Sequence, residues 1–366
     1  MDVSNQKFSG ARGMDLLSRL LLCPASGEST SRLIEELTHL SRESFDELVR
    51  LADSNHVIIR ALEVARPLLQ AAGDAEREGW LVDALLAERA RIENAIHHLA
   101  KVCATFHESG YDVSVIKSLD HWPDIGSDLD LYTNTEPEKV IAMMQSHLRA
   151  ELAARSWGDR LARKWNFIVP GLPEAIEIHM TRMGQTGEQA HLASRIARNS
   201  RIVQIEGREF RVASVSDRLM ISTLQRMYRH FYFRLCDILD SAGLCESGLV
   251  DFQALRAAAT ACGIWEGTAT YLAIVSDYVR RYRGTPVPLP DFVRQAARFG
   301  GEPVFFARDF LRVPILPQSA GLYGTQLSGL LKKRELQSSA RLGLLPWLAT
   351  AAAVGQKITG SDKGIW

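Results

Sequence analysis

The sequence has few cysteines, no excess charge of either sign and no long apolar run, and each absence disfavours a class of protein. Its 5 cysteines are odd in number and scattered singly, which argues against a disulfide framework and against a zinc site with paired ligands. The 43 Lys and Arg residues balance 43 Asp and Glu residues, whereas a dominant nucleic-acid-binding role normally leaves a basic excess. No window reaches about 18 uninterrupted apolar residues, so no transmembrane segment is predicted.

Targeting signals and common phosphate-binding motifs are also missing from the sequence. The opening residues 1–5 lack the basic-then-apolar pattern of a secretory signal, and scattered cysteines fit a reducing compartment, so we expect a cytoplasmic protein. The most apolar stretch, 342–354, is short and contains Pro346, which favours a buried or interfacial segment over a membrane span. A Gly-x-x-x-x-Gly-Lys-Ser/Thr loop and a kinase catalytic-loop signature are absent, which disfavours a kinase or phosphohydrolase.

The periodicity of the apolar residues divides the chain into three regions. Three- and four-residue spacing predicts helices over residues 1–110, and short β-rich runs with turn signals follow between 111 and 213. From 214 to 366 the helical spacing returns, with a strongly apolar helix expected over 219–239 and another near 303–313. The predicted fold class is α+β, with a small mixed β-sheet core (111–213) between an N-terminal helical region (1–110) and a C-terminal helical region (214–366).

Two closely spaced carboxylates stand out in the predicted core. Asp128 and Asp130 are separated by one leucine within an alternating strand pattern, so their side chains share one face of the strand. Two carboxylates so close repel each other, and a nearby cation is the usual remedy. Mg²⁺ suits such a site because it binds one or two carboxylates together with substrate phosphates. The spacing therefore predicts a metal site that handles a nucleotide.

A third carboxylate and a histidine belong to another predicted strand, 175–180. Alternation places Glu177 and His179 on one face of this strand. If the strand lies beside the one that carries Asp128 and Asp130, Glu177 joins the same cluster. Three acids on adjacent strands can hold two Mg²⁺ ions about 3.5–4 Å apart, as in-line phosphoryl displacement requires. His179 fits a nucleotide contact and a hydrogen-bonded structural histidine equally well.

Together these motifs resemble the nucleotidyltransferase superfamily, which includes DNA polymerase beta and the small aminoglycoside nucleotidyltransferases. That superfamily has a Gly-Gly or Gly-Ser turn, then an Asp-x-Asp strand, then a third acid on a neighbouring strand. The pattern here is most similar to a bacterial family of uncharacterised nucleotidyltransferases with Leu-Lys-Gly, Asp-x-Asp and Val-Asp-Leu-His motifs. Lys117-Ser118 stands at the turn, where serine replaces the glycine that lets backbone amides approach a triphosphate. Glu177 replaces aspartate as the third acid.

The resemblance implies a reaction and assigns roles to residues. Asp128, Asp130 and Glu177 would be the catalytic groups and would hold Mg²⁺ or Mn²⁺. An acceptor hydroxyl, on a small molecule more than on protein or RNA, would attack the α-phosphorus of an NTP, most simply ATP, and release pyrophosphate. The implied nucleotide contacts are Lys117, Ser118, Ser127, His179 and Arg234.

Several alternatives stay open from the sequence. The serine at the turn also fits a non-catalytic protein on the same fold, one that binds a nucleotide or acts as a regulatory, antitoxin-like partner. Arg234 and Asp237 are three residues apart, which is typical of an ordinary ion pair on one helix face. The basic residues between 226 and 230 fit a solvated helix face as well as a basic wall, and the aromatic residues between 228 and 233 favour packing over base stacking.

Overall fold

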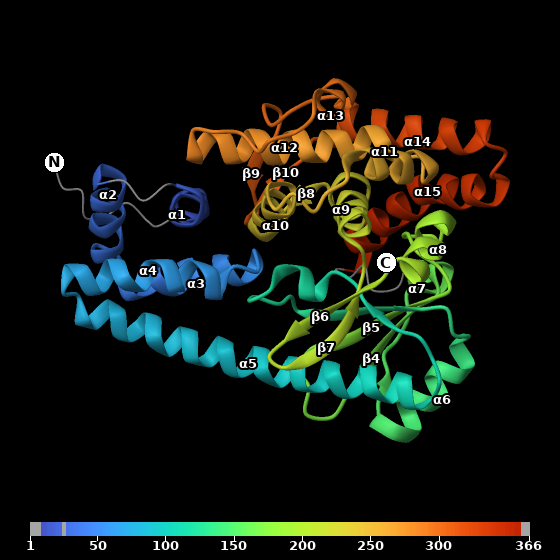
Figure 1. Ribbon diagram of the computed structural model, residues 1–366, viewed down its shortest axis with the longest axis horizontal. Coiled ribbons are helices and arrows are strands. Elements are labelled where there is room, and N and C mark those ends of the chain that lie inside the picture. Colours follow the sequence, from blue (N-terminus) through green and yellow to red (C-terminus); the bar gives the residue numbers. More distant parts are fainter. Residues whose placement is uncertain (1–8, 24–26, 360–366) are drawn as a thin grey trace.

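The computed structural model describes residues 9–23 and 27–359. Helices make up both ends of the chain and a seven-stranded mixed sheet lies between them in sequence, so this is a mixed α/β protein. Figure 1 shows the N-terminal helices at one end of the molecule, with the sheet between the long helix α5 and the C-terminal helices.

The N-terminal part is built on α5, which is 34 residues and therefore about 50 Å long. Gly73 has a left-handed backbone that ends the preceding helix, and the Asp74 side chain caps the start of α5 by accepting a hydrogen bond from the Arg77 N–H. α5 packs against α4 and then continues beneath the sheet, where it contacts α6 and β7 (Figure 1). The described helices of this part are α1 (Gly10–Leu22), α2 (Gly27–Thr38), α3 (Arg42–Ser54), α4 (Ile58–Ala72) and α5 (Ala75–Glu108).

The sheet has the strand order β3-β4-β5-β2-β1-β7-β6. Its centre is a parallel pair, β2 and β5, and the expected hairpin over 165–180 is present as the antiparallel pair β4 and β5. On both central strands alternate apolar side chains are fully buried, which fixes the register and leaves the acids on the other face. The strands are β1 (Ser114–Val115), β2 (Asp128–Thr133), β3 (Glu151–Leu152), β4 (Lys164–Ile168), β5 (Ala175–Met180), β6 (Arg201–Ile205) and β7 (Arg208–Val212).

The remaining elements connect the strands or form the C-terminal part. Within the sheet region these are the 3₁₀ turn η1 (Ser118–His121), α6 (Pro137–Leu148), α7 (Trp157–Ala162) and α8 (Ala190–Arg198). The C-terminal part contains α9 (Val215–Thr223), the π-helical turn η2 (Leu224–Arg229), β8 (Tyr232–Phe233), α10 (Leu235–Glu246), α11 (Phe252–Ala261), α12 (Trp265–Arg283), α13 (Asp291–Ala296), β9 (Phe305–Ala307), β10 (Phe310–Arg312), the turn η3 (Ile315–Ser319), α14 (Ala320–Lys332) and α15 (Leu336–Thr359).

Two helices expected from the sequence are wrong. The predicted helix over 219–239 is broken after η2, where the His230 N–H bonds to the Gln225 carbonyl and Phe231 takes a positive φ of 55°. The predicted helix near 303–313 is instead a hairpin of β9 and β10, joined by Arg308 and Asp309, which both have positive φ. β8 pairs with β10 in this second sheet. Periodicity misses the break because the partner of β8 lies far along the sequence.

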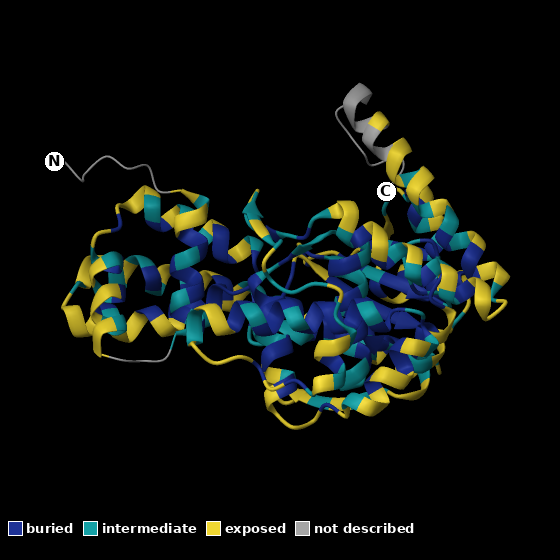
Figure 2. Cartoon of the chain, turned by 90° about the horizontal axis from the view of Figure 1, so that it is seen from above, coloured by how far each residue is buried: buried dark blue, intermediate teal, exposed yellow. Residues whose placement is uncertain are grey.

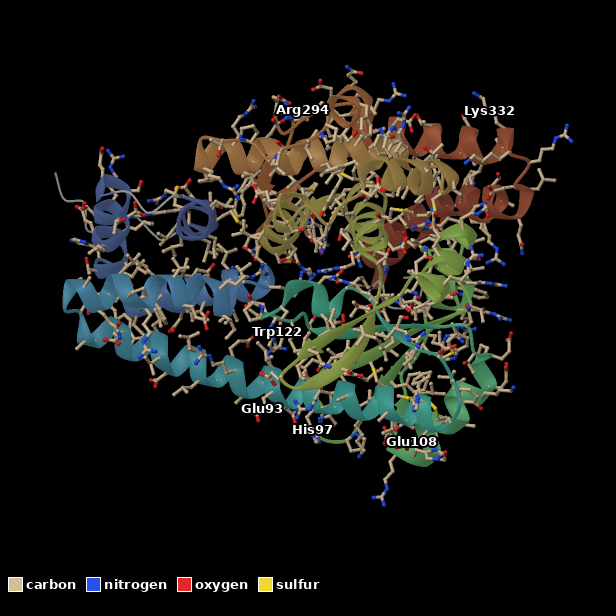
Figure 3. The ribbon with its side chains drawn as sticks, in the orientation of Figure 1. Glu93, His97, Glu108, Trp122, Arg294 and Lys332 are labelled. Atoms are coloured by element: carbon tan, nitrogen blue, oxygen red, sulfur yellow. The ribbon has the colours of Figure 1, made fainter. Side chains whose placement is uncertain are left out.

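One continuous cluster of buried hydrophobic side chains runs through the N-terminal, sheet and C-terminal parts. Figure 2 shows it as the dark centre of the molecule, with exposed residues along α15 where it extends from the body. The apolar stretch 342–354 lies within α15, where Leu342 is buried and Trp347 is 76% exposed. Among the described residues, no helix is long and apolar enough to cross a membrane. Figure 3 shows charged side chains such as Glu93 and Lys332 projecting from opposite outer surfaces.

Neighbouring leucines on α5 provide a test of this packing. Leu85 is 3% exposed and Leu86 is 61% exposed. We expect Leu85→Ala to lower the free energy of unfolding by about 2–5 kcal/mol, because it leaves a cavity in the core. The same change at Leu86 should alter it by less than about 0.5 kcal/mol. Urea unfolding of both variants measures the difference, and similar losses would contradict the described orientation of α5.

Candidate functional site

A cavity of about 180 Å³, called the polar cavity below, lies between the sheet and the turn η2. Seven of the eight site residues expected from the sequence line it, and the eighth, His179, contacts Glu177 at its edge. The sheet side carries the acids and the 117–118 turn, and the helical side carries basic and aromatic residues. The lining residues are His56, Lys117, Ser118, His121, Gly126, Ser127, Asp128, Asp130, Glu177, Gln225, Arg226, Arg229, His230, Tyr232 and Arg234.

The parallel pairing of β2 and β5 brings the acids together. Asp130 lies directly opposite Glu177 in the register, and His179 is two residues further along β5. One ligand atom from each of Asp130, Glu177 and His179 lies within 4.8 Å of the others. Asp128, the first residue of β2, is exposed and lines the polar cavity outside this compact set. The structure therefore gathers two of the three predicted acids tightly and places the third at the mouth of the cluster.

Burial and mutual repulsion shift the pKa values of these acids. Burial raises the pKa of Asp130 to about 8, with the charge of Glu177 adding to the effect and Lys117 opposing it. Burial also raises the pKa of Asp128, again with a contribution from Glu177. Burial acts in the same direction on Glu177, but Lys117, His179 and Lys164 outweigh it and hold the pKa of Glu177 well below its usual range. The cluster therefore keeps its full negative charge only with additional cations.

Two lysines supply positive charge to the acids. Lys117 pairs closely with Asp130, and its Nζ lies 3.7 Å from Oε1 of Glu177. Lys164 on β4 places its Nζ 2.9 Å from Oε2 of Glu177 and 2.9 Å from Oδ1 of Asp159. Burial disfavours the charged form of Lys164, yet the pKa of its amine is raised because Glu177 and Asp159 outweigh burial.

The turn before the acids has an unusual backbone. Lys117 has φ 67° and ψ −58°, and the Ser118 N–H donates to the Ile116 carbonyl at 2.8 Å, which closes a three-residue γ-turn. This conformation is rare and strained for a residue with a side chain. The sequence analysis placed the departure from the expected turn at Ser118, where the families that the motifs resemble have glycine. The structure places the positive φ one residue earlier, at Lys117, which also provides the cation for Asp130.

Both polar groups of Ser118 are already used within the protein. Its hydroxyl accepts a hydrogen bond from the Asp130 N–H at 2.7 Å and donates to the Asp128 carbonyl at 3.3 Å, while its own N–H closes the γ-turn. Ser118 is 3% exposed. As placed here, Ser118 fixes the turn to β2, and its predicted contact with a phosphate would require these bonds to rearrange.

His179 holds Glu177 in place. Its Nε2 lies 3.0 Å from Oε1 of Glu177. Burial lowers the pKa of His179 to about 4, despite the opposing charge of Glu177, so the ring is neutral at pH 7. A neutral ring that donates from Nε2 orients the Glu177 carboxylate without adding charge.

The helical side of the polar cavity forms a basic wall. Arg226 is 2% exposed and its Nε lies 2.7 Å from Oδ2 of Asp237, which also accepts the Arg234 backbone N–H at 2.6 Å. The expected side-chain ion pair between Arg234 and Asp237 is therefore wrong, because Arg226 occupies that carboxylate. The expected solvated helix face is also wrong for Arg226, which is buried. Among the described residues, Arg229 and Arg234 have no acidic partner within ion-pair distance. Their charges are available to an anion in the cavity.

An aromatic pair next to this wall was not expected as a site feature. Tyr232 lines the polar cavity and stacks on Phe310 with ring centroids 4.3 Å apart. The Arg234 guanidinium lies 5.9 Å from the centre of each ring. The sequence pattern could not reveal this pair, since Phe310 reaches Tyr232 only through the pairing of β8 with β10.

The donor set of the acidic cluster fits a hard divalent cation. Mg²⁺ and Mn²⁺ prefer carboxylate oxygens, and Asp128, Asp130 and Glu177 supply them at one wall of the polar cavity. Burial, with the charge of Glu177 in addition, raises the pKa of Asp130, and a cation bound beside it would favour its ionised form. His179 contributes a nitrogen that already bonds to Glu177, so we assign it to the support of that carboxylate.

Comparisons with known proteins add little to this geometry. No protein-family model matches the chain, and no curated protein sequence matches it. Among solved structures, an antigenic nucleotidyltransferase-like protein from Paracoccidioides brasiliensis is similar over 47% of this chain and 86% of that chain, with 14% identity and a TM-score of 0.32. Its description names the superfamily that the motifs resemble, but a likeness at this level assigns neither a fold family nor a function to this chain.

The strain at the turn can be tested by paired substitutions at Lys117. Lys117→Gly and Lys117→Ala both remove the ammonium group and differ only in backbone freedom. Because glycine adopts positive φ readily, we expect the Gly variant to be more stable than the Ala variant by about 1 kcal/mol. The same pair at Lys101, exposed within α5, should show the reverse order. Urea unfolding measures both differences, and an Ala variant as stable as the Gly variant at position 117 would contradict the γ-turn.

The crowding of the acids gives a dependence of stability on pH. The folded pKa of Asp130, about 8, exceeds its unfolded value, so its ionised form destabilises the fold. That destabilisation is absent below about pH 4 and grows as the pH rises to about 8. The difference in unfolding free energy between Asp130→Asn and the original protein, both measured in EDTA, should therefore grow in favour of the variant. We expect it to rise by at least about 1 kcal/mol from pH 5 to pH 8. Urea unfolding of both proteins measures the difference, and a difference that does not change with pH would contradict the raised pKa of Asp130.

Proposed function

We propose that this chain is a Mg²⁺-dependent nucleotidyltransferase. It moves a nucleoside monophosphate from an NTP, most simply ATP, to a hydroxyl of a small acceptor and releases pyrophosphate. The observation that carries the proposal is the pairing of opposite charges across one cavity. Asp128, Asp130 and Glu177 line one wall, and Arg229 and Arg234, without acidic partners among the described residues, line the other. A triphosphate with its metal ions carries both signs of charge and suits both walls.

The acids and bases of the cavity take separate roles. Asp128, Asp130 and Glu177 would hold the divalent cation, which supplies charge neutralisation for the phosphates and a lower pKa for the acceptor hydroxyl. Arg229 and Arg234 bind phosphate oxygens and so fix the triphosphate against the acidic wall. His179 keeps the Glu177 carboxylate in its orientation through the bond from Nε2.

The remaining predicted contacts fit the same arrangement. Lys117 lines the cavity and neutralises a phosphate oxygen once the acids hold their own cation. Ser127 lines the cavity beside Asp128 and is available for a phosphate or ribose hydrogen bond. The stacked rings of Tyr232 and Phe310 offer an apolar face on which a nucleobase can pack.

A non-catalytic nucleotide-binding protein is the second candidate, and one observation favours it. Lys117 and Lys164 already neutralise Asp130 and Glu177, so the acidic cluster has partners without any metal. A protein that keeps these pairs on binding ATP would hold the nucleotide without turnover. It could then act as a regulatory, antitoxin-like partner on the same fold.

Label transfer from nucleotides separates these candidates. The protein is incubated with each α-³²P-labelled NTP, Mg²⁺ or Mn²⁺, and a cell extract that supplies acceptors. We expect labelled product and pyrophosphate, with at least an approximately hundredfold loss for Asp128→Asn and for Asp130→Asn, because each removes charge at the metal cluster. The surface variant Asp83→Asn is the matched control and should transfer label normally.

Two outcomes of the same assay would contradict the enzyme proposal. Tight binding of ATP by equilibrium dialysis without transfer or pyrophosphate release would support the non-catalytic candidate. Label that passes to product from γ-³²P-ATP, and none from α-³²P-ATP, would instead identify a kinase.

A further inference from the structure

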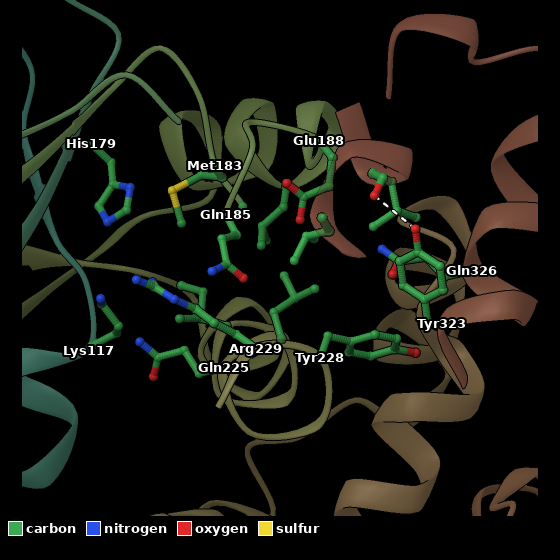
Figure 4. A pocket seen from close by; sticks show the side chains of 16 residues that line it. Lys117, His179, Met183, Gln185, Glu188, Gln225, Tyr228, Arg229, Tyr323 and Gln326 are labelled. Atoms are coloured by element: carbon green, nitrogen blue, oxygen red, sulfur yellow. Dashed lines mark hydrogen bonds between the residues drawn. The ribbon is translucent and has the colours of Figure 1, made fainter. Parts of the chain in front are cut away.

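A second, smaller pocket of about 60 Å³, called the apolar pocket below, adjoins the polar cavity. Lys117, Gln225 and Arg229 line both spaces, so the two are neighbours around these side chains. In Figure 4, Lys117 and His179 lie at one end of the apolar pocket, and Tyr323 and Gln326 lie at the other. A molecule in this pocket therefore has one end beside the acidic cluster and the other beneath the C-terminal helices.

The walls and size of the apolar pocket favour a slim molecule. Its volume is about a third of that of the polar cavity, which favours a slim chain over a purine ring with its sugar. Six of its sixteen lining residues have aliphatic side chains, and polar side chains lie at both ends and also between them, where Figure 4 labels Gln185 and Glu188. The aliphatic side chains are those of Met183, Leu192, Ile221, Leu224, Leu342 and Leu345.

The far end of the pocket has a buried amide without partners. Gln326 on α14 is 1% exposed, and neither its Nε2 nor its Oε1 has a hydrogen-bond partner among the described residues. An amide buried in this way costs about 1–3 kcal/mol for each unmade bond, and native proteins rarely keep both unmade. Both atoms are unpaired, so exchanging the amide nitrogen and oxygen would not remove the deficit. Gln326 therefore offers one donor and one acceptor to a ligand.

The wall around Gln326 is held in place by neighbouring contacts. The Tyr323 hydroxyl donates to the Leu342 carbonyl at 2.9 Å, which ties α14 to α15 across the end of the pocket. Tyr228 packs so closely on the backbone of Gly267 that a Cβ there would lie 2.2 Å from its hydroxyl. The pocket is thus bounded by fixed side chains, as a preformed ligand site requires.

We infer that the apolar pocket binds the acceptor of the transfer, and that this acceptor is a slim aliphatic alcohol with a carboxamide-like group at its far end. The inference rests on the proposed nucleotidyltransferase function. The carboxamide pairs with both atoms of Gln326, and the hydroxyl lies near Lys117 and His179. In the transfer, the hydroxyl oxygen forms a bond to the α-phosphorus, the bond from that phosphorus to the bridging oxygen breaks, and pyrophosphate leaves with the electron pair. The hydroxyl proton is released to solvent.

The nucleobase fits better in the polar cavity, on the other side of Lys117, Gln225 and Arg229. Tyr232 lines the polar cavity and stacks on Phe310, and the guanidinium groups of Arg234 and Arg312 lie within 5.9 Å of both ring centres. Stacking on aromatic rings suits a base of any identity. Among the described residues that line the apolar pocket there is no stacked aromatic pair, which leaves this pocket for the acceptor.

Binding of simple probes tests the inference without relying on turnover. The probes are ω-hydroxyalkanamides of roughly four to eight carbons and the matching alkanols without the amide. Ligand-observed NMR on the full chain should show that the best hydroxyamide binds at least about tenfold more tightly than its alkanol. Gln326→Leu should remove this preference, whereas Gln253→Leu, an exposed control, should keep it. ATP binding should change less than about twofold in both variants.

A second variant protects the test if Gln326→Leu does not fold. Leu345→Trp should fill the pocket from α15, abolish hydroxyamide binding and leave ATP binding in place. Loss of ATP binding in this variant, with hydroxyamides unaffected, would assign the pocket to the nucleobase and overturn the inference. Equal binding of hydroxyamides and alkanols by the original protein would overturn it as well.

Transfer assays with the same probes distinguish the two proposals. If hydroxyamides bind in a Gln326-dependent manner but neither they nor extract components receive label from α-³²P-ATP, the nucleotidyltransferase proposal fails and the pocket remains a ligand site. If an extract component is labelled equally well by the original protein and Gln326→Leu, and hydroxyamides are not, the acceptor inference fails and the enzyme proposal stands. Labelling of hydroxyamides that drops at least about tenfold in Gln326→Leu supports both.

Discussion

The structure of the site depends on the cost of burying two carboxylates, Asp130 and Glu177, next to each other. The parallel register of β2 and β5 places these buried carboxylates side by side, and the buried apolar face of both strands prevents any shift in that register. Two lysines offset the charge of these carboxylates: Lys117 in its strained turn pairs with Asp130, and Lys164 on the adjacent strand pairs with Glu177. A fold that needed only stability would not retain such a pair, so the cluster indicates a function.

The acidic half of the site could be predicted because it depends on short-range rules. Alternation along each strand sets the face that Asp128, Asp130 and Glu177 share, and the hairpin signals placed 175–180 within the core. The basic half could not be predicted, because it depends on a break in the helix after Arg229 and on strands that pair over a long separation in sequence. Spacing alone favoured Arg234 as the partner of Asp237, but the π-helical turn brings Arg226 to that carboxylate.

The turn before β2 forms without the glycine that the nucleotidyltransferase motifs have at this position. Lys117 takes the strained positive φ, the Ser118 N–H closes the turn, and the Ser118 hydroxyl bonds the turn to β2. Strain of this kind persists only where the surroundings over-determine the backbone. Here the ion pair with Asp130 and the two hydrogen bonds of Ser118 supply that support.

The two spaces of the site are built from parts of the chain that differ in how freely they can vary. The acids belong to the central strands β2 and β5, whose register is fixed by fully buried apolar side chains on the opposite face. The end wall around Gln326 belongs to α14 and α15, which join through the Tyr323–Leu342 hydrogen bond and follow every strand in sequence. Substitutions in α14 or α15 can therefore reshape the end wall around Gln326 while the acids on β2 and β5 keep their places.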